Sequence, residues 1–175
     1  TGFGGRKSDG IKIEALLQAS GQKTGTYLSP HVISLAERFR VDGHELDVGS
    51  VIAPVLDAVR AVDREASEPV TQFELLTVAA LYRFATEAVD VAIVEAGLGG
   101  RHDATNVLNA GVVVLTSIAL EHEQQLGTRR SDIAAEKLAV VRPGATGVLG
   151  EPEGRDAAIA RGASRVVDAC TPDAL

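Results

Sequence analysis

The sequence is poor in cysteine, in large aromatic side chains and in basic charge. Its 175 residues include one cysteine, Cys170, no methionine and no tryptophan, and aromatic residues make up 3%. A single cysteine excludes an internal disulfide, so we expect a reducing, cytoplasmic location. The formal net charge of −7 argues against nucleic acid as a partner, because phosphate backbones bind basic faces. No apolar run is long enough to cross a membrane. None suggests an obligate partner, so we expect a monomer.

The hydrophobic residues, 45% of the chain, alternate between strand-like and helix-like patterns. The predicted strands are 24–28, 36–43, 89–95, 111–120, 147–149 and 164–167. One helix is predicted directly after a turn at 1–8, and four others are predicted at 51–62, 73–88, 131–141 and 155–161. This alternation is typical of an α/β fold with a doubly wound, mostly parallel sheet flanked by helices.

The stretch from Val89 to Asn106, VDVAIVEAGLGGRHDATN, combines an apolar run with a carboxylate and glycines. An almost continuous apolar run predicts a strand that is buried on both faces. Glu95 ends this strand, and burying it is costly unless a metal or a cation meets it. Because ligands bind at the carboxyl ends of parallel strands, we expect a site there, with Glu121 and His122 close by at the end of the next strand. The alternative is an ordinary strand followed by a glycine turn.

The N-terminal stretch GFGGRKS predicts a glycine-rich turn that opens a helix. Such a turn aims backbone N–H groups and the positive helix end at an anion such as phosphate. Arg6 or Lys7 would add positive charge, and the Ser8 hydroxyl could bind Mg²⁺. The alternative is a flexible, solvated terminus.

Five ordered motifs cover nearly the whole chain: YLSPHVISLAERFRVDG, QFELLTVAALYRFA, VDVAIVEAGLGGRHDATN, VVVLTSIALEHEQQLG and DIAAEKLAVVRPG. Together they resemble the folylpolyglutamate synthase and dihydrofolate synthase family of the Mur ligase superfamily. The resemblance implies that residues 1–175 form a P-loop NTPase-like central ATP-binding domain, and we expect a fragment that lacks a preceding strand and a C-terminal domain. It also implies an ATP-dependent amide ligase that joins L-glutamate to a dihydropteroate or folate carboxyl group through an acyl phosphate.

The resemblance also implies roles for individual residues. Gly2, Gly5, Arg6, Lys7 and Ser8 would form the phosphate loop. Ser8 and Glu95 would bind a first Mg²⁺, His122 would bind a second, and Lys137 would act in catalysis as a carbamate. Phe73 and Asp103 would bind the pterin, and Ser29, Pro30 and His31 would form the loop beside that pocket. Without the resemblance, Lys137 would be expected to be solvated, as most helical lysines are.

One departure from the family motivates a second hypothesis. Relatives carry a loop resembling GTNGKGS, whereas GFGGRKS places Arg6 at the lysine position unless Lys7 replaces it. Arginine and lysine present their charge with different geometry. The alternative is therefore a non-catalytic relative that binds a nucleotide or pterin through a degenerate phosphate loop. A peptidoglycan-ligase acceptor is a third possibility, which Phe73 and Asp103 disfavour.

Overall fold

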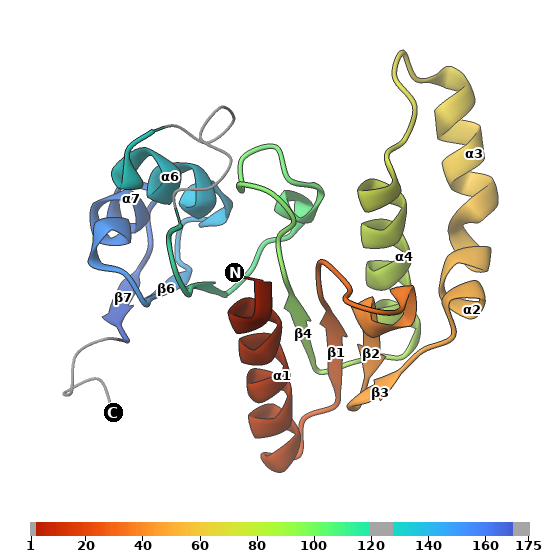
Figure 1. The fold of residues 1–175 in the computed structure, drawn as a ribbon, viewed down its shortest axis with the longest axis horizontal. Coiled ribbons are helices and arrows are strands. Elements are labelled where there is room, and N and C mark those ends of the chain that lie inside the picture. The colour runs from red at the N-terminus through yellow and green to blue at the C-terminus, as the bar shows by residue number, and fades with distance from the viewer. Residues whose placement is uncertain (1–2, 120–127, 170–175) are drawn as a thin grey trace. The chain divides into compact units, whose positions relative to one another are not determined.

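The computed structural model describes residues 3–119 and 128–169, with side chains from Asp9 onward. It divides into two compact units, Thr1–Gly97 and Leu98–Leu175, each of which is described by itself. Figure 1 shows the ribbon of both. None of the described helices is long and apolar enough to span a bilayer.

The first unit is a four-stranded mixed sheet with helices packed on it. Its elements are α1 (Phe3–Ala19), β1 (Thr24–Tyr27), the 3₁₀ turn η1 (Leu35–Arg38), β2 (Phe39–Val41), β3 (His44–Glu45), α2 (Val48–Ile52), η2 (Ala53–Val55), α3 (Leu56–Glu65), α4 (Gln72–Thr86) and β4 (Val91–Val94). The strand order is β3-β2-β1-β4. The pair β1–β4 is parallel, whereas β1–β2 and β2–β3 are antiparallel.

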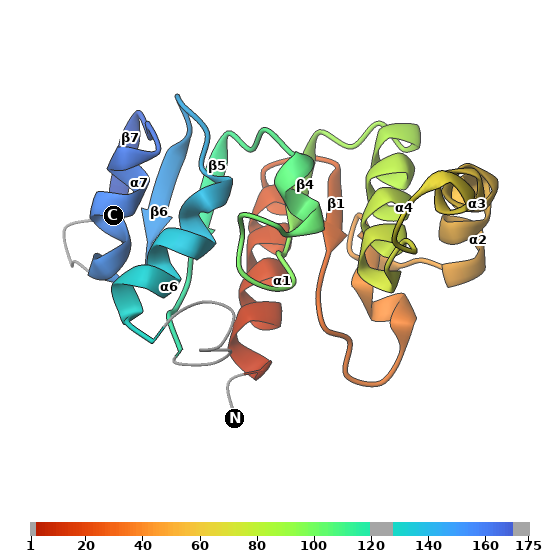
Figure 2. The same cartoon turned by 90° about the horizontal axis from the view of Figure 1, so that it is seen from above.

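Strand β1 is buried along its whole length because helices cover both of its faces (Figure 2). On one face Thr26 donates a hydrogen bond of 2.9 Å to Glu14 of α1. On the other face Gly25 lies against α4, where a Cβ atom would come within 2.6 Å of the Phe84 ring. The rest of the core of this unit comes from the sheet, α2 and α4 and includes Tyr27, Phe39, Val51, Leu76 and Phe84.

The second unit is a three-stranded parallel sheet with order β5-β6-β7. Its elements are η3 (Ala104–Val107), β5 (Val112–Leu115), α6 (Arg130–Lys137), η4 (Leu138–Val140), β6 (Thr146–Leu149), η5 (Pro152–Gly154), α7 (Arg155–Ala160) and β7 (Arg165–Asp168). Helices α6 and α7 both contribute to the core that forms on the Leu115 and Leu149 face of the sheet (Figure 2). Crossover helices between parallel strands produce this arrangement.

The α/β fold is confirmed, and three of the five described strand pairs are parallel. The β1, β6 and β7 strands, α4 and α7 lie where the patterns predicted them. Asp42 and Gly43 form a tight turn between β2 and β3, with positive φ angles of 47° and 77°. Both residue types tolerate this backbone region, which is why the pair marks a tight hairpin.

Three local predictions were wrong. Helix α1 begins at Phe3, where a glycine-rich turn was expected, because glycine lowers helix propensity without preventing a helix. Residues 35–38 form η1, so the predicted strand at 36–43 begins only at Phe39. The third error concerns β4, which was expected to be buried on both faces, and β5, which lies in the strand expected at 111–120 and is also only partly buried. Ala92 in β4 and Val112 and Val114 in β5 are exposed, since each strand ends its described sheet.

Candidate functional site

Three elements of the first unit meet at one end of its sheet. Helix α1 runs antiparallel to β1, because Gln18 contacts Thr24, Glu14 contacts Thr26, and a Cβ atom on Gly10 would meet Leu28. The N-terminal end of α1 therefore lies at the carboxyl end of β1. Parallel pairing with β4 brings the carboxyl end of that strand to the same place (Figure 1). The first N–H groups of a helix lack intrahelical partners and favour anions.

Glu95 and Ser29 connect the ends of the two strands. The Ser29 N–H donates a hydrogen bond of 3.0 Å to Glu95 Oε2. Ser29 is buried and Glu95 is half-buried. We expected a metal or a cation to meet this carboxylate, and in the structure a backbone N–H meets one of its oxygens. The carboxylate therefore has a defined position at the end of the sheet.

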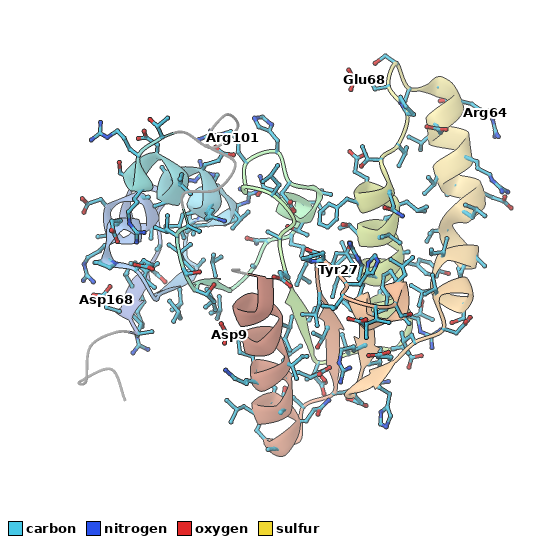
Figure 3. All side chains as sticks on the ribbon, viewed as in Figure 1. Asp9, Tyr27, Arg64, Glu68, Arg101 and Asp168 are labelled. Carbon is cyan, nitrogen blue, oxygen red and sulfur yellow. The ribbon has the colours of Figure 1, made fainter. Side chains whose placement is uncertain are left out.

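Phe73 lies beside this junction. Its ring centroid is 5.9 Å from that of Tyr27, with a tilt of 32° between the planes. A Cβ atom on Gly97 would lie 2.8 Å from Phe73 Cζ, so a larger residue at position 97 would require the ring to shift. Tyr27 is fully buried, whereas Phe73 is half-buried. The site thus has an aromatic wall two residues beyond Glu95; Tyr27 is labelled in Figure 3.

The loop that follows β1 is held by its own side chains. The peptide bond between Ser29 and Pro30 is cis, and His31 Nδ1 accepts a hydrogen bond of 3.0 Å from Arg38 Nε. Glu37 accepts hydrogen bonds from the backbone N–H groups of three successive residues, Val32, Ile33 and Ser34. The exposed part of the loop is therefore bonded to η1, although Ser29, Pro30 and His31 were predicted only as a substrate loop.

Lys137 and Asp103 lie in the second unit. The loop that contains Asp103 also contains Gly100, which packs against Lys137. Asp103 is buried, and its carboxylate accepts hydrogen bonds from Leu98 N–H at 2.9 Å and from the N–H and hydroxyl of Thr105. Lys137 is half-buried and ends α6, where its carbonyl group packs against Gly100. The structure gives Asp103 a role in closing the loop, and its pterin contact stays a prediction.

The remaining predicted site residues are only partly described. The backbone of Gly5, Arg6, Lys7 and Ser8 lies in the first turns of α1, and their side chains are outside the described part of the chain. Gly2 and His122 lie outside it altogether, as does Glu121. Within residues 3–119 and 128–169, no three His, Cys, Asp or Glu side chains cluster as a metal site would.

Sequence reasoning missed two groups of residues, one in each unit. Glu37 and Arg38 hold the loop after β1, and the pattern Ser34-x-x-Glu37 is a capping-box signal that could have identified Glu37. Glu136 contacts Arg101 across the second unit. No local signal reveals that pair, because its members are 35 residues apart.

Comparison with known proteins supports the resemblance, although no protein-family model matches the chain. The dihydrofolate synthase/folylpolyglutamate synthase of Escherichia coli K12 is 40% identical over 152 residues, which are 87% of this chain and 35% of that protein. The folylpolyglutamate synthase of Arabidopsis thaliana is 36% identical over 81% of this chain and 23% of its own length. The chain thus spans about a third or less of these curated relatives.

Solved structures give the same result. E. coli FolC in complex with DHPP and ADP matches with a TM-score of 0.82 and 38% identity, over 91% of this chain and 39% of that one. The bifunctional synthase of Yersinia pestis, complexed with AMPPNP and a Mn ion, matches with a TM-score of 0.80 and 36% identity, over 94% and 41% of the two chains. The fold is thus that of the Mur ligase-like α/β proteins. Within this class, and over the part that the matches cover, the chain belongs to the folylpolyglutamate synthase/dihydrofolate synthase family.

Proposed function

We propose that the full-length product of the gene encoding this chain is an ATP-dependent amide ligase. It would join L-glutamate to the carboxyl group of dihydropteroate or a folate through an acyl phosphate, with residues 1–175 as the ATP-binding central domain. The observation that carries the proposal is the meeting of the N-terminal end of α1 with the carboxyl ends of β1 and β4 at Glu95. An anion-binding helix end beside a positioned carboxylate suits a magnesium nucleotide.

The residues of the first unit fit one Mg²⁺ bound together with ATP. Mg²⁺ commonly takes one or two carboxylates and completes its shell with phosphate oxygens and water, so a three-residue protein cluster is not needed. Glu95 would supply the carboxylate, and Ser8 a hydroxyl from the start of α1. The metal would neutralise charge on the phosphoryl oxygens. The N–H groups of the first turn of α1, with Arg6 or Lys7, would hold the phosphates. A second Mg²⁺ at His122 belongs to the proposal as well.

The acceptor substrate would bind beside Glu95. Phe73 presents a half-buried ring, and one side of it already packs on Gly97 and Tyr27. Aromatic faces stack on flat heterocycles such as a pterin. Ser29, Pro30 and His31 would form the adjoining loop, and Asp103 would bind the pterin by hydrogen bonding. Lys137, as a carbamate, would supply negative charge near the second metal. We further propose a monomeric, cytoplasmic protein that takes only small-molecule partners.

A second candidate is a relative that binds a nucleotide or a pterin without ligating it. The observation in its favour is that residues 3–8 are helical in α1. A phosphate loop wraps several N–H groups around the phosphates, whereas a straight helix offers only those of its first turn. The change from lysine to Arg6 points in the same direction. This candidate predicts ATP binding without acceptor-dependent turnover.

The deciding experiment measures ADP release by the full-length product with ATP, Mg²⁺ and L-glutamate. Dihydropteroate, a reduced folate and no acceptor are compared. Release that needs both glutamate and a pteroyl acceptor supports the ligase. A folded protein that binds ATP and shows no acceptor-dependent release would support the second candidate.

A paired variant then tests the site. Glu95→Gln keeps an oxygen that can accept the Ser29 N–H hydrogen bond and removes the charge. We expect kcat to fall about a hundredfold or more while the melting temperature stays near that of the parent. Glu68→Gln is the matched control, because Glu68 is exposed in the linker before α4 (Figure 3). Unchanged turnover in Glu95→Gln would remove Glu95 from the site.

A further inference from the structure

The loop from Leu98 to Val107 is attached at three points to the end of α6 and to the segment that follows this helix. Arg101 donates two hydrogen bonds to the Glu136 carboxylate, from its backbone N–H at 3.1 Å and from Nε at 3.2 Å. Gly100 packs so closely on the end of the helix that a Cβ atom would lie 2.5 Å from the Lys137 carbonyl oxygen. At the other end of the segment, Arg142 Nη2 donates to Asn106 Oδ1 at 2.8 Å and to the Asn106 carbonyl at 2.7 Å.

These contacts close into a ring. Asn106 Nδ2 donates a hydrogen bond of 2.8 Å to the Arg101 carbonyl, which links the two attachment points within the loop. The segment 136–142 links them on the other side. Lys137 lies within this ring, next to Glu136. Successive helical residues point about 100° apart, so the Glu136 side chain can face Arg101 while Lys137 points elsewhere.

Helix α6 depends on tertiary contacts, which include its core residues Ile133 and Ala134 as well as this attachment. It has eight residues, and its N-cap residue Arg129 makes no side-chain capping bond. Helices this short are not stable alone. At its start, Arg130 bonds to the Ile118 carbonyl and to Glu151 and Glu153, and these contacts fix that end. Glu136 and Gly100 fix the end that carries Lys137.

We infer that Glu136, held by Arg101, is a positioning residue that sets the direction of the Lys137 amine. The inference rests on the proposed function, in which Lys137 acts at the reaction centre. Glu136 acts through the backbone of the last turn of α6. The competing explanation is an ordinary half-exposed ion pair, with side-chain exposures of 54% for Arg101 and 22% for Glu136, that contributes little.

The first test uses steady-state ligation by the full-length product. We expect Glu136→Ala to lower kcat at least tenfold with the KM for ATP within twofold of the parent. Glu136→Gln keeps an acceptor for the Arg101 N–H and should restore most of the activity, and Arg101→Ala keeps that N–H and should fall between the two. The control is Arg155→Ala, which breaks the half-exposed Arg155–Asp168 pair of the same unit and should leave kcat unchanged.

The second test does not depend on ligation. Acetic anhydride is used at limiting concentration in buffer free of carbon dioxide, below the melting temperature of every variant. Mass spectrometry gives the acetylation rate of Lys137 relative to Lys12, an exposed lysine of α1. We expect this ratio to change at least threefold in Glu136→Ala and to stay at the parental value in Arg155→Ala. If Glu136→Ala does not fold, Arg101→Ala takes its place with a smaller expected change.

The two tests separate the failure of the inference from the failure of the proposed function. Parental kcat and a parental acetylation ratio in the Glu136 and Arg101 variants would overturn the positioning role while the ligase assignment stands. A parent protein without ligase activity would overturn the proposed function, and the acetylation ratio would still decide whether Glu136 directs Lys137.

Discussion

Strands β1 and β5 differ in burial in the direction opposite to their composition. β1 has the sequence TGTY and is buried at every position, whereas β5 is VVVL and has Val112 and Val114 exposed to 59% and 46%. β1 lies between β2 and β4 and has α1 and α4 on its faces. β5 pairs with β6 alone among the described strands. Neighbouring elements, more than hydrophobicity, decide how deeply a strand lies.

Polar residues in a buried strand need partners, and Thr26 of β1 obtains its partner from a charged pair. Glu14 of α1 is 2% exposed and accepts hydrogen bonds from Thr26 at 2.9 Å and from Arg40 Nε at 2.9 Å. Arg40 belongs to β2, so this carboxylate connects a helix and two strands. No comparable group is needed at β5, whose alternate residues either enter an apolar core or face solvent.

The largest effect is expected from removing the centre of this polar group. Glu14→Ala leaves the Arg40 guanidinium largely buried, with 17% of its side chain exposed, and with the Glu45 carboxylate at 3.7 Å and the Gly43 carbonyl as its remaining partners. Breaking a buried pair from one side costs about 3–5 kcal/mol. Urea unfolding measures the loss, with Asp57→Ala as the control, because Asp57 pairs with Arg60 on the surface at 3.4 Å. Equal stability of the two variants would mean that the hydrogen bonds of Glu14 contribute no more to the free energy of unfolding than a surface ion pair does.

A smaller loss is expected from a methyl group added to each strand region. Gly25→Ala would place its Cβ 2.6 Å from the Phe84 ring, whereas Gly111→Ala, just before β5, meets nothing within 4 Å. Overpacking of this kind costs about 1–3 kcal/mol. Gly111→Ala should be neutral or slightly stabilising, since alanine restricts the unfolded chain. Thermal unfolding of the two variants checks the contrast, and similar losses would show that β5 is as enclosed as β1.

The third prediction exchanges polar and apolar side chains of similar shape. Thr26→Val removes a donor from Glu14 and should cost about 1 kcal/mol, although it makes the buried strand more hydrophobic. Val114→Thr makes the exposed face of β5 more polar and should change stability by about 0.5 kcal/mol or less. Urea midpoints give both values. If Thr26→Val instead stabilised the protein, the hydrophobicity of the strand, and not its polar partners, would account for the burial of β1.

These contrasts show how far the sequence predicts this fold. The α4 helix and the β1, β6 and β7 strands were predictable because caps, turns and periodicity act within a few residues. The burial of β4 and β5 was not, since it depends on which elements lie beside them. Glu14 carries no local sign of burial, because its partner Arg40 is 26 residues away.

The same division holds for the candidate site. The position of Glu95 at the carboxyl end of a strand followed from the apolar run and the glycines after it. The hydrogen bond from the Ser29 N–H to Glu95 could not be predicted, since it joins residues that are 66 positions apart. The ion pair between Arg101 and Glu136 could not be predicted either, because both are common surface residue types. Local patterns therefore predicted the candidate site, and long-range pairing determines how Glu95 in one unit and Arg101 in the other are held.

The smallest effect concerns the helices that cover the two sheets. Helix α4 has a capping box in which Glu74 accepts hydrogen bonds from the Thr71 hydroxyl at 2.6 Å and its N–H at 2.8 Å, whereas α6 has no side-chain cap. The Thr71 hydroxyl, followed by its N–H, lowers the pKa of Glu74 below its ordinary value of 4.5. A carboxylate with a lower pKa in the folded state stabilises it above the unfolded pKa, and this contribution is lost as the pH falls through the folded pKa. Glu74→Gln should therefore lower the melting temperature slightly at neutral pH. The difference from the parent should shrink below pH 4.5.

Melting temperatures measured from neutral to acidic pH test this prediction. Thr71→Val should flatten the same pH dependence, because it removes the strongest donor to Glu74. A difference that stays constant with pH would mean that the cap acts through the neutral hydrogen bonds alone.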